Sequence, residues 1–221
     1  MSDQAQIAQL FDSISKGKAE QVDHLLNQNP QLALCQNAQG IRPLLWAMYH
    51  RQTELMKRIY RQVESPLAEE MLAADDLKAL KNKLENLPEL LSWESADGFS
   101  LLHYACFFGR EGAARMLLQK GADKNHPAAN PSGVCPIHSA AASHSVGLVR
   151  LLLDAGADPD AQQAGGYTAL MSAAAHNHTD LLEALLTGGA DKSITDDQGR
   201  TAYQHGLEKG FEIPTLKPGV A

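Results

Sequence analysis

The sequence has few cysteines and no long run of apolar residues. Its three cysteines, Cys35, Cys106 and Cys135, are an odd number at wide, irregular spacing, which fits a reducing compartment better than a disulfide framework. No apolar run approaches the roughly 18 residues that span a bilayer. The N-terminus, MSDQAQIAQL, lacks the basic and apolar segments of a secretory signal. We therefore expect a cytoplasmic protein with no membrane partner.

An excess of basic charge is also missing. The 221 residues include 19 Lys and Arg against 26 Asp and Glu, a formal net charge of -7. Because nucleic-acid affinity depends largely on clustered Lys and Arg that neutralise phosphates, we expect no nucleic-acid partner. The chain also contains no Walker loop, no G-x-S-x-G elbow and no H-E-x-x-H pair. We therefore expect no cofactor, no metal and no catalytic residue.

What the sequence does contain is an internal repeat. The phrase Gly-Ala-Asp begins at 121, 156 and 189, each time after a leucine-rich stretch, and the glycines at 98, 133, 166 and 199 are spaced by 35, 33 and 33 residues. Each of these four glycines opens a helix-like phrase: GFSLLHYACFFG, GVCPIHSAAASH, GYTALMSAAAHN and GRTAYQHGLEKG. Two landmarks that keep the same period predict stacked copies of one small structural unit.

This pattern resembles the ankyrin repeat, in which G-x-T-P-L-H-x-A-A opens the first helix, V-x-L-L-L ends the second, and G-A-D leads into a hairpin. The resemblance is specific over residues 97–200. Before residue 97 it is weaker, although residues 29–47 and 87–105 align without gaps at an offset of 58. Such an offset is too long for one unit, and a further, degenerate helix pair that starts at residues 65–67 accounts for the excess.

The resemblance implies an all-α solenoid of about seven stacked helix pairs with short β-hairpin or turn fingers. We predict a single ankyrin-repeat domain over residues 1–221. Its parts are an N-terminal capping helix pair at 4–37, a repeat without its hairpin at 38–64, a degenerate repeat at 65–96, repeats at 97–131, 132–164 and 165–197, and a C-terminal capping repeat with a nonhelical tail at 198–221.

Residue chemistry at the ends of the helices supports these boundaries. The hydroxyls of Ser100 and Thr168 are suited to cap the first helix, and Pro136 stands at a first helical position, where its missing N–H has no consequence. The glycines at 121, 156 and 188 or 189 stand where the second helix ends in a left-handed conformation. Small residues such as Ala140–Ala142 let helices of successive repeats approach closely.

The stretch GVCPIHSAAASH, residues 133–144, holds the strongest pair of groups for enzyme or metal chemistry, Cys135 and His138. Aligned with its sister repeats, Cys135 takes the capping position, His138 the histidine position of the ankyrin phrase, and His144 the turn between the helices. A nucleophilic cysteine needs an orienting third group, and zinc needs a second pair of ligands. The sequence supplies neither, so we expect all three residues to belong to the scaffold.

Two other groups of polar residues have a structural interpretation. His176 and His178 resemble a ligand pair, but His178 stands where ankyrin repeats often have a histidine, which leaves His176 for recognition. The acids at 74–76 and 195–197 lie at a helix junction and a hairpin tip, where we expect caps or solvated turns. Asn125 matches a position that is hydroxylated in some ankyrin repeats, and we do not predict its modification.

In the ankyrin family, partners usually bind the concave face made by the hairpins and first helices. The residues of this face that contact partners flank the turn glycine or are the last two residues of the first helix. Carried over to this chain, they predict partner contacts at Ile41, Tyr49, His50, Phe99, Phe107, Phe108, Val134, Tyr167 and His176, with Ser143, Arg200, Glu208 and Lys209 at the same positions of other repeats. Exposed aromatic residues are the strongest anchors, although Phe107 or Phe108 alternatively packs against the degenerate unit.

These observations predict a non-enzymatic module that binds a protein partner and is a monomer when free. An accessory protein of the immunity or inhibitor type, which occludes a partner enzyme, uses the same surface and stays as the alternative. A Cys/His-dependent enzyme or a metal-binding protein is a more distant one.

Overall fold

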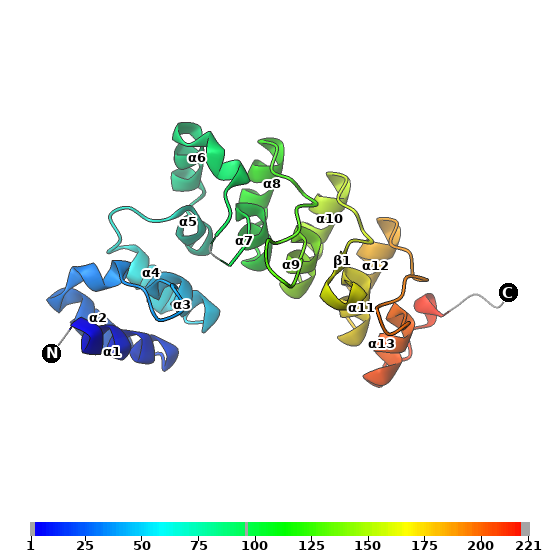
Figure 1. Ribbon diagram of the computed structural model, residues 1–221, viewed down its shortest axis with the longest axis horizontal. Coiled ribbons are helices and arrows are strands. Elements are labelled where there is room, and N and C mark those ends of the chain that lie inside the picture. The colour runs from blue at the N-terminus through cyan, green and yellow to red at the C-terminus, as the bar shows by residue number, and fades with distance from the viewer. Residues whose placement is uncertain (1–2, 96, 218–221) are drawn as a thin grey trace. The chain divides into compact units, whose positions relative to one another are not determined.

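The computed structural model describes residues 3–95 and 97–217, and the regular secondary structure of this part of the chain is almost entirely helical (Figure 1). The chain divides into two compact units, unit 1 (residues 1–83) and unit 2 (residues 84–221). The only sheet among the described residues is a pair of two-residue strands. The prediction of an all-α fold is confirmed.

Unit 1 consists of helix pairs that pack against one another. The first helix of each pair contacts the next, as do the second helices of the first two pairs. The elements are α1 (Asp3–Ser15), α2 (Ala19–Gln28), the 3-10 turn η1 (Pro30–Leu34), α3 (Pro43–Tyr49), α4 (Thr53–Tyr60), α5 (Ala68–Ala74) and α6 (Leu77–Asn86), whose last residues belong to unit 2.

Unit 2 continues the same pattern more regularly. Its first helices pack in the order α7, α9, α11 and α13, and its second helices in the order α8, α10 and α12 (Figure 1). The elements are η2 (Pro88–Ser92), α7 (Leu101–Phe107), α8 (Glu111–Gln119), α9 (Pro136–Ala142), α10 (Val146–Asp154), β1 (Gln162–Gln163), η3 (Ala164–Gly166), β2 (Tyr167–Thr168), α11 (Ala169–Ala175), α12 (Thr179–Thr187), α13 (Ala202–Glu208) and η4 (Pro214–Leu216).

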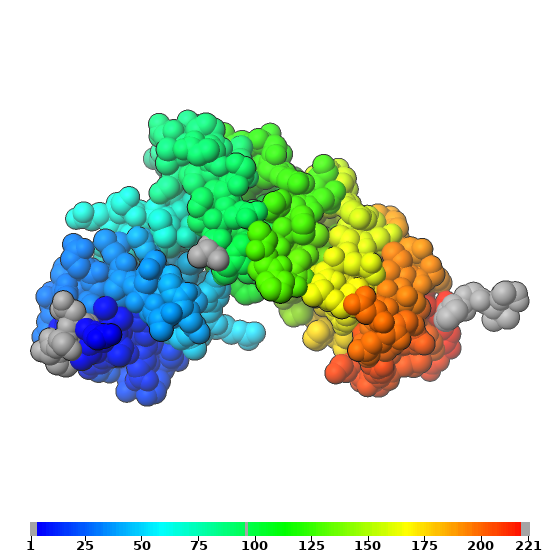
Figure 2. Space-filling model, in the orientation of Figure 1, coloured from blue at the N-terminus to red at the C-terminus, as the bar shows by residue number. Residues whose placement is uncertain are grey.

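Each repeat of unit 2 contacts its neighbours along the chain. In the space-filling view, its residues therefore follow one another in bands from green to red (Figure 2). The core lies between the helices, where leucines of both helix rows are fully buried, among them Leu102, Leu117, Leu152 and Leu185. No repeat could bury this surface alone, so the stability of each depends on its neighbours.

The predicted ends of the helices are largely confirmed. The hydroxyl of Ser100 accepts from the backbone N–H of His103, the hydroxyl of Thr168 accepts from Met171, and Pro136 is the first residue of α9. His144 has φ 57°, as expected for a turn residue. Of the two glycines offered at the end of α12, it is Gly189, with φ 97°, that adopts the left-handed conformation.

Cys135 is the N-cap residue of α9, as predicted, although its thiol makes no capping hydrogen bond to the helix. It donates instead to the carbonyl oxygen of Asn125 at 3.6 Å, while the Cys135 N–H donates to His138 Nδ1. The tail was expected to be nonhelical, yet it contains the 3-10 turn η4 and buries Ile213 and Leu216. Residues 218–221 lie outside the described residues.

Candidate protein-binding surface

The fingers of unit 2 are the hairpin turns that precede α7, α9, α11 and α13, and backbone hydrogen bonds join each finger to the next. Bridges Glu94–Ser100 and Thr195–Thr201 and the strand pair β1–β2 close three of them as antiparallel turns. From one finger to the next, the N–H of Ala129 donates to Gly98 O, that of Ala164 to Ser132 O, and that of Asp197 to Gly165 O, at 2.8 to 2.9 Å. The tips of the fingers are therefore held in register.

Two buried histidines strengthen this register. Nε2 of His103 lies 2.7 Å from the carbonyl oxygen of Val134, and Nε2 of His138 lies 3.2 Å from that of Tyr167, each in the following finger. Burial lowers the pKa of His103 to about 4 and also lowers the pKa of His138. Both imidazoles are thus neutral near pH 7, and each donates across a repeat boundary. The structural role predicted for His138 is confirmed.

In four of the fingers one polar residue fixes the turn, and the sequence analysis missed this role. Three positions before the turn glycine, a polar side chain accepts backbone N–H groups: Asn37 from Gln39 and Ile41, Ser95 from Phe99, Asn130 from Ser132, and Asp196 from Gln198 and Arg200. The recurring spacing from the glycine was a signal that could have revealed it. Only the finger with Gln163 departs from the pattern.

Asp196 is the most heavily bonded of these residues. Besides the turn, it accepts from Arg200 Nε and Nη2 at 2.9 and 2.7 Å, and His205 Nε2 lies 2.9 Å from Oδ2. Burial by itself would raise the pKa of this carboxyl, but the hydrogen bonds, first those from Arg200, lower it below its usual range. The expectation of a solvated turn was wrong for Asp196, which is buried, and fits the exposed Asp197.

The predicted contact residues divide into two groups. Those that follow the turn glycine are half-buried. Phe99, for example, meets His103 and Tyr104 edge-on at 5.6 and 6.1 Å, and Tyr167 meets His205 of α13 edge-on at 4.9 Å. This group comprises Ile41, Phe99, Val134, Tyr167 and Arg200.

The residues at the end of the first helix are mostly exposed. Phe107 is 49% exposed and Tyr49 is 36% exposed, each as the last residue of its helix. His50 and His176 follow as exposed C-cap residues, and Glu208 and Lys209 are exposed at the end of α13. Ser143 is half-buried. The predicted residues of unit 2 thus present side chains at successive repeats.

Phe108 departs from this expectation. It is only 7% exposed, because its ring stacks on Tyr104 at 5.7 Å with an interplanar angle of 25°. The ring of Phe107 meets the ring of Phe108 edge-on at 5.5 Å, and Phe107 remains accessible to solvent. The prediction that both phenylalanines form the aromatic centre is therefore corrected: Phe108 belongs to the core and supports Phe107.

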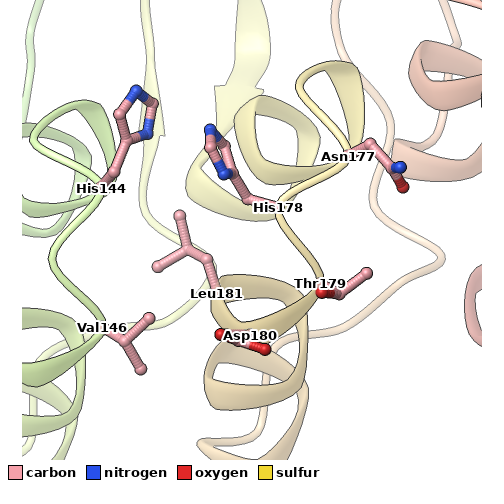
Figure 3. A pocket seen from close by; sticks show the side chains of 7 residues that line it. All are labelled: His144, Val146, Asn177, His178, Thr179, Asp180 and Leu181. Atoms are coloured by element: carbon pink, nitrogen blue, oxygen red, sulfur yellow. The ribbon is translucent and has the colours of Figure 1, made fainter.

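The turns before α10 and α12 bring three histidines together. His144 and His178 have ring centroids 4.1 Å apart and line a cavity of about 180 Å³ with Thr179 and Asp180 (Figure 3). His176 lies 6.0 Å from His178 and 6.3 Å from His144. The sequence placed His144 and His178 in separate scaffold roles and missed that they meet. Burial, and then the two neighbouring histidines, lower the pKa of His178.

The thiols lack the setting of a nucleophile. Burial raises the pKa of Cys35 to about 11 and raises those of Cys106 and Cys135 as well. Each of these thiols therefore stays protonated near pH 7. Within residues 3–95 and 97–217, no group of three or more His, Cys, Asp or Glu side chains is arranged to hold a metal ion.

Unit 1 contains a different buried polar group. Glu70 is fully buried at the start of α5, where Oε2 accepts from the N–H of Leu67 at 2.8 Å and from Arg42 Nη1 at 3.1 Å, while Oε1 has no hydrogen-bond partner. Its neighbour Glu69 is also buried. Burial raises the pKa of both carboxyls. The sequence analysis expected nothing of these two residues.

Hydrogen-bonded fingers on stacked helix pairs define a helical repeat protein with a rigid outer face. The family model described as ankyrin repeats (3 copies) matches residues 10–128, and that described as ankyrin repeats (many copies) matches residues 137–186. The chain belongs to the ankyrin repeat family, whose repeats generally mediate protein–protein interaction. The predicted family is confirmed.

Curated relatives contain the same kind of repeat. The chain is 31% identical over 153 residues to human Neurogenic locus notch homolog protein 2, covering 68% of this chain and 6% of that protein. It is 29% identical over 166 residues to Palmitoyltransferase AKR1 of Kluyveromyces lactis, covering 72% and 21%. It is 43% identical over 70 residues to Regulatory protein NPR5 of Arabidopsis thaliana, covering 31% and 14%. The chain thus spans a small part of each relative.

Proteins of this family are typically interaction modules without enzymatic activity, although the similarity to a palmitoyltransferase shows that ankyrin repeats also occur within an enzyme. Among the described residues, no helix has the length and apolar character needed to cross a membrane.

Proposed function

We propose that this chain is a non-enzymatic module that binds a protein partner through the fingers and first helices of unit 2. The observation that carries the proposal is the exposure of Phe107 on a helix whose position is fixed by packing and by the finger hydrogen bonds. Aromatic side chains dominate binding energy when a partner buries them. A rigid scaffold also loses little conformational freedom on binding.

The neighbouring positions suit the edge of such a surface. His176 is exposed one helix pair after Ser143, and Glu208 and Lys209 follow at the end of α13. This arrangement places an aromatic anchor at one end of the row and polar groups at the other, which is the composition of a non-obligate interface. In unit 1, Ile41, Tyr49 and His50 form a second candidate group.

We further propose that the free chain is a cytoplasmic monomer with a protein partner and no nucleic-acid partner. The formal charge of -7 supports the last point, because phosphate binding needs clustered basic groups.

The proposal is tested by affinity capture from the source organism with wild type, Phe107→Ser and the control Leu87→Ser. Leu87 is likewise exposed in unit 2, at 42%. We expect a partner that wild type and the control retain and Phe107→Ser loses, with equal circular dichroism for all three. The same captured proteins with Phe107→Ser would contradict the proposal. If the partner is an enzyme, its activity with and without the chain separates scaffolding from inhibition.

A further inference from the structure

The last helix pair of unit 2 has no second helix among the described residues. α8, α10 and α12 pack one against the next, but α13 is followed by an irregular segment, 211–217, that includes η4. This segment buries Ile213 and Leu216. It does not fill the space beside α12, because a cavity of about 420 Å³ remains between α12 and the segment.

The cavity lies on the face of α12 that corresponds to a covered face of α10. Leu153 of α10 fits closely under the end of α12, where a Cβ on Gly188 would lie 2.4 Å from Leu153 Cδ1. Leu186 occupies the same position of α12, 33 residues later. It lines the cavity, together with Leu182, Ile213 and Pro214. On this face of α12, Leu182 is buried at 3% exposed, whereas Leu186 is half-buried and Pro214 of the segment is exposed. Leu186 and Pro214 are therefore the apolar side chains that a partner could reach.

The row of first helices ends in the same way. One position is shared by Cys106 of α7, Ala141 of α9, Ala174 of α11 and Leu207 of α13. The first three are at most 2% exposed, because the next helix covers them, whereas Leu207 is 45% exposed. A large apolar side chain thus stands on the last first helix of the described residues, where the earlier repeats have small covered side chains.

The charged residues that line the cavity indicate the charge of a partner that could bind there. Glu183 and Glu212 line it, and no lysine or arginine does. Glu212 pairs with Lys217 at 2.6 Å, so Glu183 is the carboxylate most available to a partner. In a symmetric contact between two copies, Glu183 of one copy would face Glu183 of the other, which disfavours self-association.

We propose that this cavity is a docking site for a basic amphipathic helix of a partner protein. The helix would stack on α12 in the position of a second helix, place apolar side chains against Leu186 and Pro214, and bring basic side chains to Glu183. This surface goes beyond the proposed function, because it is formed by a second helix and the segment 211–217 rather than by the fingers and first helices.

The test uses two synthetic peptides of equal length, held helical by side-chain lactam bridges. Both have Leu at i, i+3, i+4 and i+7, and their polar faces carry either Lys or Glu. We expect fluorescence anisotropy to show binding of the Lys peptide to the full chain, and binding of the Glu peptide that is at least about tenfold weaker.

Two variants and a control locate the binding. Leu186→Asp should weaken the Lys peptide at least about tenfold, because it places a carboxylate on the apolar floor. Glu183→Lys should reverse the preference between the two peptides. Leu87→Asp, outside the cavity, should change neither, and Phe107→Ser should also leave peptide binding unchanged, which separates this site from the proposed function.

The proposal is overturned if the Lys peptide does not bind, if both peptides bind equally, or if Leu186→Asp binds the Lys peptide like wild type while keeping its circular dichroism. Sedimentation provides one further outcome. If the wild type dimerises and Leu186→Asp is monomeric, the occupant is a second copy and the proposed partner is wrong.

Discussion

Units 1 and 2 are built from the same kind of helix pair, but their buried polar groups differ. Those of unit 2 include histidines, and those of unit 1 include carboxylic acids. In unit 2, neutral histidines donate from one repeat to the next finger. In unit 1, Arg42 takes the position of Ser100 and pairs with the buried Glu70. The comparison teaches that the family pattern fixes the packing of the helices, while the polar links between repeats can be replaced.

The same positions differ in burial between the units. Residues 29–47 and 87–105 align at an offset of 58, which relates Gly40 to Gly98 and, further along, His50 to Phe108. Phe108 is buried and His50 is exposed. Gly98 lies against the next finger, whereas no atom lies within 4 Å of the place that a Cβ on Gly40 would take. The same substitution can therefore be made at the two related positions. The difference in lost stability separates the effect on the local backbone from the effect on packing between repeats.

The chain offers one tryptophan in each unit for such measurements. Trp46 lies in unit 1 and Trp93 in unit 2. Urea unfolding followed by fluorescence in Trp93→Phe and Trp46→Phe backgrounds reports on unit 1 and unit 2, respectively.

The largest difference is expected for Phe108→Ala against His50→Ala. Phe108→Ala should lower the free energy of unfolding of unit 2 by about 3 to 5 kcal/mol, because it leaves a cavity under Phe107. His50→Ala should lower that of unit 1 by less than about 1 kcal/mol. Equal losses in the two units would contradict the different burial of this position.

Gly98→Ala against Gly40→Ala is the next test. Both glycines have positive φ, 80° and 76°, so each substitution should cost about 1 kcal/mol in backbone strain. At Gly98 the new Cβ would also lie 2.7 Å from the carbonyl carbon of Ala129. We expect a total loss of about 2 to 3 kcal/mol in unit 2 from urea unfolding. Equal losses for the two variants would show that the fingers do not restrict one another.

The two units should respond to acid in opposite directions. The folded pKa of His103, about 4, lies below the ordinary value of 6.5, so folded unit 2 binds this proton less well than the unfolded chain. Unit 2 should therefore lose stability as the pH falls from about 6.5 toward about 4, on the order of 2 kcal/mol by pH 5. In the same unit, the lowered pKa of Asp196 acts only below its ordinary value of 3.8.

In unit 1, the raised pKa values of Glu69 and Glu70 mean that the folded state binds protons better than the unfolded chain. Unit 1 should gain stability as the pH falls from neutral toward their ordinary value of 4.5. Urea unfolding at pH 7 and pH 5 with the two tryptophan reporters measures the slope of unfolding free energy against pH for each unit. Glu70→Gln should reduce the slope of unit 1 and leave that of unit 2 unchanged. Slopes of the same sign in both units would contradict this account.

The smallest expected effect concerns the start of the first helix. Ser100→Ala should lower the stability of unit 2 by about 1 kcal/mol, because the N–H of His103 loses its acceptor. Cys135→Ser should change it by less than about 0.5 kcal/mol, since the thiol is not a cap. Urea unfolding with the Trp93 reporter measures both, and a larger loss for Cys135→Ser would mean that its bond to Asn125 matters more than the cap.

Most of the fold could be predicted from particular residues. The period of the glycines placed the helix pairs of unit 2, and the hydroxyls of Ser100 and Thr168 marked where first helices begin. The candidate surface was harder, because exposure depends on which neighbour covers a side chain. Phe107 and Phe108 are adjacent and chemically identical, yet Phe108 stacks on Tyr104 and is 7% exposed, whereas Phe107 is 49% exposed. Residue type alone therefore did not show which of the two is exposed and which belongs to the core.

By itself, the sequence determined the family, the helix pairs and the left-handed turns, because these follow from short-range steric and capping rules that act within one repeat. Tertiary structure alone decided which groups meet across repeats. The contact of His144 with His178, the burial of Glu70 and the cavity beside α12 depend on residues some thirty positions apart in the sequence. Such contacts arise only when the units stack, since burial is a property of the neighbours as much as of the residue.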